Sequence, residues 1–173
     1  MKRIVTAFLL VISFSLASAA FGAEGVKLGY VDVQKVLLNS DAGKEAKEQL
    51  AAKANKYEGE KNTREEELKR LKAELEKQNV LLSESARGAK EKDYQQKLKE
   101  YQRFMKDAQD DMQAKNDELT NRIVDEIVKL IQNYGRNNGY TVVFVKNDSM
   151  IYVDEKSDLT DQVLKVFNAS KKK

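Results

Sequence analysis

The sequence contains no cysteine, no histidine, no tryptophan and no proline. Without cysteine the chain forms no disulfide, and without histidine it has neither the usual general base nor the commonest zinc ligand. A phosphate-binding loop is also absent, because the Gly43-Lys44 pair has Leu38 where that motif requires glycine. Asp32 is the one acid in an apolar run, and we interpret it as a structural hydrogen-bonding or turn residue. The sequence therefore predicts no enzymatic activity and no cofactor or metal.

Residues 1–22 have the pattern of a cleaved secretion signal. Lys2 and Arg3 precede an apolar run over residues 4–16, and small residues follow at 17–20. The alternative is a membrane anchor, but the apolar run is shorter than the about 20 residues that a span requires. We therefore expect export, with cleavage between residues 19 and 23.

Charged residues make up 34% of the chain, but the two signs nearly balance. Loss of Lys2 and Arg3 with the signal lowers the formal net charge from +3 to +1, so no general affinity for nucleic acid or an anionic membrane is expected. One basic segment lies between residues 77 and 99, and it includes Arg87, Lys90, Lys92 and Lys97. These cations form either a solvated helix end or a weak contact for an acidic client, a lipid headgroup or lipopolysaccharide.

From residue 41 to residue 134 apolar side chains recur at alternating steps of three and four, on two successive limbs. This 3.5-residue spacing is that of a coiled coil, and the absence of proline suits long unbroken helices. The outgoing seam consists of Ala46, Leu50, Ala54, Tyr57, Leu68, Leu71, Leu75 and Leu82, and the returning seam of Leu98, Tyr101, Met105, Ala108, Met112, Leu119, Ile123 and Ile127. We predict a long antiparallel helical hairpin over residues 41–134, and we call it the arm.

The two seams also predict which residues face each other. If the limbs are symmetric about a tip between residues 86 and 87, Leu68 faces Met105 and Ala54 faces Leu119. Leu75 with Leu98, Leu50 with Ile123 and Ala46 with Ile127 follow the same symmetry, so five apolar positions of the outgoing limb meet apolar positions of the returning limb. This is the arrangement that buries the seam.

Turn chemistry supports a tip at the same place. Residues 83–88 are small or polar, and Gly88 can adopt a positive φ. We therefore place the tip within residues 83–90, the outgoing helix over about 41–82 and the return helix from about 90 to 134.

Two basic residues interrupt the apolar seam midway along the outgoing limb. Lys61 and Arg64 occupy seam positions beside Gly59. Either this zone bends, because glycine weakens a helix, or the aliphatic stems of the two side chains cover the seam and nothing bends.

Strand-like segments flank the arm on both sides. Residues 26–33, 140–145 and 150–153 are rich in β-branched and aromatic side chains, with turn residues at 146–149. A terminal helix capped by Ser157 or Asp158 would carry its apolar face on Leu159, Val163, Val166 and Phe167. We assign residues 24–40 and 135–173 to a head with three short strands and a C-terminal helix.

The head is small for an independent core, at about 60 residues. Its strands carry apolar side chains on both faces, only one helix is available as cover, and an open sheet edge invites pairing with another chain. We therefore predict an obligate oligomer whose core contains Leu28, Tyr30, Val142, Phe144, Ile151 and Val153.

Three groups of residues carry a family resemblance. They are the run at 28–37, the helix start at 40–44, and the closing runs at 139–144, 151–154 and 158–163. In order and spacing they resemble the Skp/OmpH family of periplasmic chaperones over essentially the whole mature chain. The resemblance implies a periplasmic homotrimer in which strands of three subunits form a small β-barrel body and helical arms enclose a cavity. Its members hold unfolded outer-membrane proteins without ATP.

A holdase of this kind needs apolar side chains for client contact. The candidates are Val80 and Leu81 near the tip, Phe104 beside the seam, and the seam residues Tyr57, Tyr94, Tyr101, Met105 and Met112. The alternative to a chaperone is a non-catalytic coiled-coil scaffold of the cell envelope, which would have a similar arm.

Overall fold

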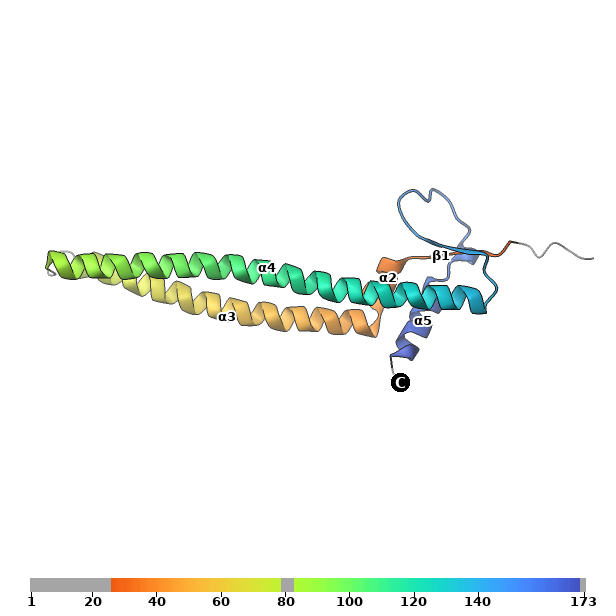
Figure 1. Cartoon of the computed structure of the whole chain (residues 1–173), viewed down its shortest axis with the longest axis horizontal. Helices are drawn as coiled ribbons and strands as arrows, with labels where there is room; N and C mark the ends of the chain where they lie inside the picture. Colours follow the sequence, from red (N-terminus) through yellow and green to blue (C-terminus); the bar gives the residue numbers. More distant parts are fainter. Residues whose placement is uncertain (1–25, 79–82, 172–173) are drawn as a thin grey trace, which may run out of the picture.

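The computed structural model describes residues 26–78 and 83–171, which form a long two-helix arm and a small head (Figure 1). In chain order the elements are β1 Leu28–Val31, α2 Val33–Asn39, α3 Asp41–Gln78, α4 Glu84–Asn137, β2 Val142–Val145, the 3-10 helix η2 Glu155–Ser157 and α5 Thr160–Ser170. The predicted helical hairpin is confirmed, because α3 and α4 run side by side in opposite directions (Figure 1). At 1.5 Å per residue they are about 60 and 80 Å long.

β1 and β2 form a parallel sheet that joins the two ends of the hairpin. Leu28 pairs with Val142 and Val31 with Val145. The start of α5 is tied to the same sheet, because the Leu159 amide donates to the Tyr30 carbonyl oxygen at 2.9 Å. The head is thus assembled from segments that lie on opposite sides of the arm in the sequence.

Residues 150–153, predicted as the third strand, are not a strand. They lie in the loop between β2 and η2, which projects from the head at the upper right of Figure 1. Ile151 is 99% exposed and Tyr152 is 85% exposed, so neither side chain has a packing partner that would hold a strand in place. Within the described residues the sheet has two strands and does not close into a barrel.

Two side-chain caps form the corners that lead into the arm. Asp32 Oδ1 accepts a hydrogen bond from the Lys35 amide at 2.8 Å and caps α2, which confirms its structural role. Ser40 Oγ accepts from the Gly43 amide at 3.0 Å at the start of α3. The chain turns so tightly there that a Cβ on Gly43 would lie 1.8 Å from the Leu37 carbonyl oxygen.

The hydrophobic core sits where the base of the arm meets the head. Its most fully buried members are Val31, Val36, Leu119, Ile127, Val163 and Phe167. The predicted apolar face of the terminal helix is confirmed for Leu159, Val163 and Phe167, whereas Val166 is 42% exposed and lies off that face. The base is therefore the part of the chain with a globular interior.

The predicted register of the two limbs is wrong by about one heptad. Lys97 Nζ contacts Glu67 Oε1 at 3.1 Å, so Leu68 lies level with the residues around Lys97 and not with Met105. Nearer the base, Ala54 shares a groove with Met112 and not with Leu119.

The physical reason is that a 3.5-residue repeat maps onto itself when one limb slides by seven residues. Apolar periodicity alone therefore cannot distinguish neighbouring registers.

The segment predicted as the tip is also helical. Ser83 is the N-cap of α4, and its Oγ accepts from the Ala86 amide at 3.3 Å. Gly88 lies inside the helix, and among the described residues only Gly139 has a positive φ. α4 thus begins at Glu84, inside the segment that was expected to turn, and its start differs from the predicted start near residue 90.

Candidate functional site

The middle of the arm contains an aromatic pair. Tyr57 on α3 and Phe104 on α4 meet edge to face, with ring centroids 6.0 Å apart and an interplanar angle of 68°. Both side chains are half-buried, because each packs against the opposite helix and leaves part of its ring at the surface. The pair links the two limbs, and both of its rings belong to predicted client-contact residues.

Charged groups hold both rings from one side. The Tyr57 hydroxyl donates to Asp111, and Lys53 Nζ lies 2.5 Å from the same carboxylate. The Arg64 guanidinium carbon lies 4.6 Å from the centroid of the Phe104 ring, within cation–π range. The hydrogen bonds from Lys53 and then Tyr57 lower the pKa of Asp111, and the hydrogen bond to Asp111 raises the pKa of Tyr57. Asp111 is therefore a carboxylate anchor that joins the limbs.

The other side of the pair faces an apolar groove of about 430 Å³. Small alanines, methionines and the two aromatic rings supply its apolar lining, namely Ala54, Tyr57, Phe104, Met105, Ala108 and Met112. Met105 is 38% exposed and Met112 is half-buried. The structure thus brings together four of the predicted contact residues, Tyr57, Phe104, Met105 and Met112, at one place on the arm surface.

Toward the tip, polar contacts connect the limbs. The Tyr101 hydroxyl donates to Glu65 at 2.7 Å, and this hydrogen bond raises the pKa of Tyr101. Lys90 Nζ donates to Glu74 at 3.0 Å, which lowers the pKa of that carboxyl. Tyr101 is therefore fixed by a carboxylate and lies outside the apolar groove.

Among the described residues, one further predicted contact candidate lies elsewhere on the outer arm. Tyr94 is half-buried on α4, outside the apolar groove. Val80 and Leu81 lie outside the described residues.

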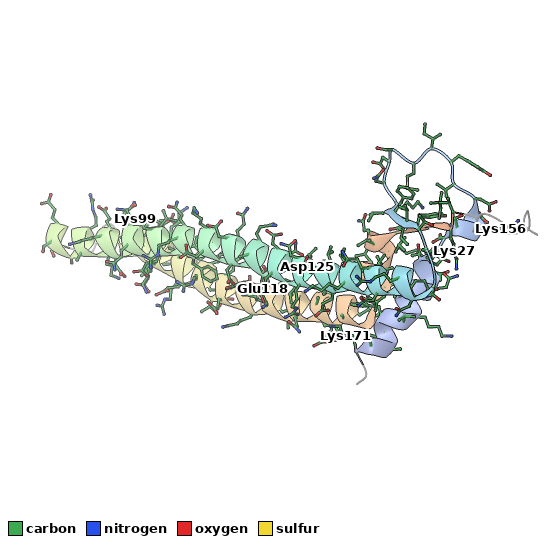
Figure 2. The ribbon with its side chains drawn as sticks, turned by 45° about the vertical axis from the view of Figure 1, so that its right-hand side comes forward. Lys27, Lys99, Glu118, Asp125, Lys156 and Lys171 are labelled. Carbon is green, nitrogen blue, oxygen red and sulfur yellow. The ribbon has the colours of Figure 1, made fainter. Side chains whose placement is uncertain are left out.

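The basic side chains near the tip are largely engaged within the arm. Arg87 pairs with Glu91 at 3.2 Å along α4, whereas Lys90 and Lys97 pair with carboxylates of α3. Lys92 is exposed, and Lys99 projects from the outer half of the arm in Figure 2. The local excess of positive charge is thus partly used to hold the two limbs together.

The predicted oligomer residues of the head differ in exposure. Tyr30 is buried within the subunit at 8% exposure, and Val153 is half-buried. Exposed apolar side chains gather on the sheet and the following loop: Leu28, Val142, Phe144, Val145, Ile151 and Tyr152. A single subunit therefore leaves a large apolar surface uncovered on its head.

Sequence reasoning missed the polar half of the mid-arm site. Lys53 and Asp111 belong to charged runs that resemble any solvated helix face, and only the correct register shows that they meet. Arg64 was identified as an interruption of the seam, and its guanidinium in fact covers Phe104.

The described residues include no group of three or more histidine, cysteine, aspartate or glutamate side chains that could hold a metal. No helix within residues 26–78 and 83–171 is long and apolar enough to cross a membrane.

Comparison with known proteins identifies the family. The sequence profile of the family described as outer membrane protein (OmpH-like) matches residues 27–167. An uncharacterized protein of Aquifex aeolicus (strain VF5) is 33% identical over 135 residues, which are 78% of this chain and 82% of that protein.

A solved structure has the same fold. The crystal structure of a candidate outer membrane chaperone (OmpH-like) from Caulobacter crescentus CB15 superposes with a TM-score of 0.78. It covers 86% of this chain and 88% of that chain at 17% sequence identity, a level at which the likeness shows the fold alone. Because the family profile spans nearly the whole chain beyond the predicted signal, the protein belongs to the OmpH-like family, which its sequence resembles.

Proposed function

We propose that this protein is an ATP-independent holdase of the periplasm that keeps unfolded outer-membrane β-barrel proteins from aggregating. The observation that carries the proposal is the arm itself. Beyond the core at its base, α3 packs against α4 alone, so the outer hairpin stabilises nothing else in the subunit. Its groove and half-buried rings are therefore available to another molecule.

The proposal includes assembly through the head, with a homotrimer as the expected form. Exposed apolar side chains that gather on one part of a protein can mark an interaction site, and β1, β2 and the following loop carry several. Pairing of residues 150–153 with the sheet of another subunit would cover Ile151 and Tyr152 and extend the open sheet. Copies joined in this way would project their arms from a common body and enclose a space between them.

Client capture would then depend on many weak contacts. A partly buried apolar side chain contributes about 1–2 kcal/mol. Several such contacts from separate arms act together, because the first contact raises the effective concentration of the next. Release needs no ATP, since each single contact is weak, and a client enclosed between arms meets no second unfolded chain.

The test is suppression of aggregation by the mature protein. A urea-denatured outer-membrane barrel protein is diluted into buffer with increasing amounts of the chaperone, and light scattering is recorded. We expect scattering to fall to the buffer level at a fixed stoichiometry, and native mass spectrometry to show the oligomer with one client. The folded barrel protein in detergent is the control and should not bind. Undiminished scattering at excess chaperone would refute the proposal and favour the envelope scaffold.

A further inference from the structure

The apolar groove at the middle of the arm contains an exposed methionine, Met105. Met105 is the most exposed large apolar residue among the described residues of α3 and α4. It lies in a groove whose other apolar members come from both helices, including Ala54 and Ala108, which leave space because they are small. The surface of the arm is otherwise mostly charged, so the groove around Met105 is an exposed apolar recess on it.

The aromatic wall of this groove is held in place before anything binds. The Tyr57 hydroxyl is fixed by Asp111, and the Phe104 ring is covered by Arg64, both from the polar side. These contacts restrict the motion of the two rings, and the ring edges that remain free line the recess. Because the two rings are already ordered, binding of a ligand loses little of their conformational entropy. This favours recognition of a single side chain.

The charges at the rim do not select a charged occupant. Lys61 pairs with Glu58 at 3.2 Å, and Lys106 pairs with Asp110 at 2.6 Å. A carboxylate or ammonium group entering the groove would lose hydration and find these rim charges already paired. An uncharged apolar group avoids this cost.

We propose that the groove receives one aromatic side chain of an extended, unfolded client, inserted between Met105 and the Tyr57–Phe104 pair. The volume of about 430 Å³ lies at the low end for sites that take small organic groups, so it suits a side chain and not a folded element. Aromatic rings are favoured over aliphatic groups because ring edges and methionine sulfur both make directional contacts with a π face. The inference rests on the proposed holdase function and names the class of side chain that the arm selects.

The probe is a short, flexible, capped peptide with a single tryptophan and no charged residue. The protein contains no tryptophan, so the emission reports the probe alone. We expect the emission to shift to the blue on titration with the mature protein. Competitor peptides with phenylalanine at the central position should displace the probe at least about tenfold more effectively than those with alanine or glutamate, a difference of about 1.4 kcal/mol.

Two matched substitutions locate the site. Ala54→Glu places a charge at the groove, whereas Ala51→Glu adds the same charge to an exposed position of α3 outside it. Ala54→Glu should weaken probe binding by about tenfold or more, and Ala51→Glu should leave it unchanged. Met105→Gln, which keeps the length of the side chain, should also weaken binding. Circular dichroism checks that each variant retains its helix content.

The outcomes distinguish this inference from the proposed function. If the wild-type protein suppresses aggregation but binds the phenylalanine, alanine and glutamate peptides equally, the groove is not selective and the inference is wrong while the holdase proposal stands. Equal loss of probe binding in Ala54→Glu and Ala51→Glu would also overturn the inference. Absence of probe binding by the wild-type protein would overturn it as well. If the probe binds selectively and depends on Ala54 while scattering is undiminished, the groove is supported and the holdase proposal fails.

Discussion

The register of the arm gives a direct test of the structure. Cysteines introduced at Leu68 and Leu98 lie at half-buried positions beside the Glu67–Lys97 ion pair, whose charged atoms are 3.1 Å apart. Position 105 is seven residues further along α4, a displacement of about 10 Å along the helix. A disulfide requires Cα atoms within about 7 Å, so we expect 68 to join 98 and not 105.

The assay is oxidation of the two double variants, followed by non-reducing electrophoresis and peptide mapping. The natural chain has no cysteine, so every bridge arises from the introduced pair. A bridge within one subunit at 68 and 98, and little at 68 and 105, is the expected result. The reverse pattern would show that the limbs have the register deduced from apolar periodicity, and the placement of the mid-arm groove would then be wrong.

Three further predictions concern stability. Phe167→Ala removes a ring that is 1% exposed and should lower the free energy of unfolding by about 3–5 kcal/mol, whereas Val166→Ala, at a side chain 42% exposed, should have a much smaller effect in urea titrations followed by circular dichroism. Gly43→Ala should lower the free energy of unfolding by about 1–3 kcal/mol, because its Cβ would lie 1.8 Å from a carbonyl oxygen. Gly59→Ala, in open space within α3, should raise the free energy of unfolding by about 1 kcal/mol. Changes of the same sign in the two variants would refute the reasoning. The fold lowers the pKa of Asp111 from its ordinary value of 3.8, so the stabilising contribution of its carboxylate is complete above that value and is lost as the pH falls through the lower folded pKa. Hydrogen exchange of mid-arm amides, corrected for the intrinsic rate, should therefore be constant between about pH 7 and pH 5 and faster below about pH 4. This acid effect should be smaller in Asp111→Asn.

The parts of the fold that depend on local pattern could be predicted from the sequence. Alternating steps of three and four determine an amphipathic helix without reference to the rest of the chain, so the hairpin and the buried face of α5 were both recognised. A structural hydrogen-bonding role for Asp32 was expected for the same reason, since a cap acts within about three residues of its own position.

The parts that depend on a partner could not be predicted in the same way. A heptad repeat is satisfied by several registers, so the apolar pattern alone could not choose between them. Ser83 is the N-cap of α4, inside the segment that was expected to turn. Residues 150–153 have the composition of a strand, but strand propensity is realised only beside a sheet edge with which to pair. The mid-arm groove needed the correct register before Ala54 and Met112 could be placed in the same groove.

The parallel pairing of β1 with β2 has a consequence for the order in which the molecule is made. Lys27 and Thr141, hydrogen-bonded at the beginning of the sheet, are separated by 114 positions in the chain. As the chain is made from its N-terminus, β1 therefore cannot pair with β2 until nearly all of the polypeptide is present. The hairpin can zip earlier, because contacts near its turn are short-range, and zipping shortens the loop that the last step must close. Until then the incomplete chain carries an unpaired apolar strand and is itself an unfolded protein exposed to aggregation.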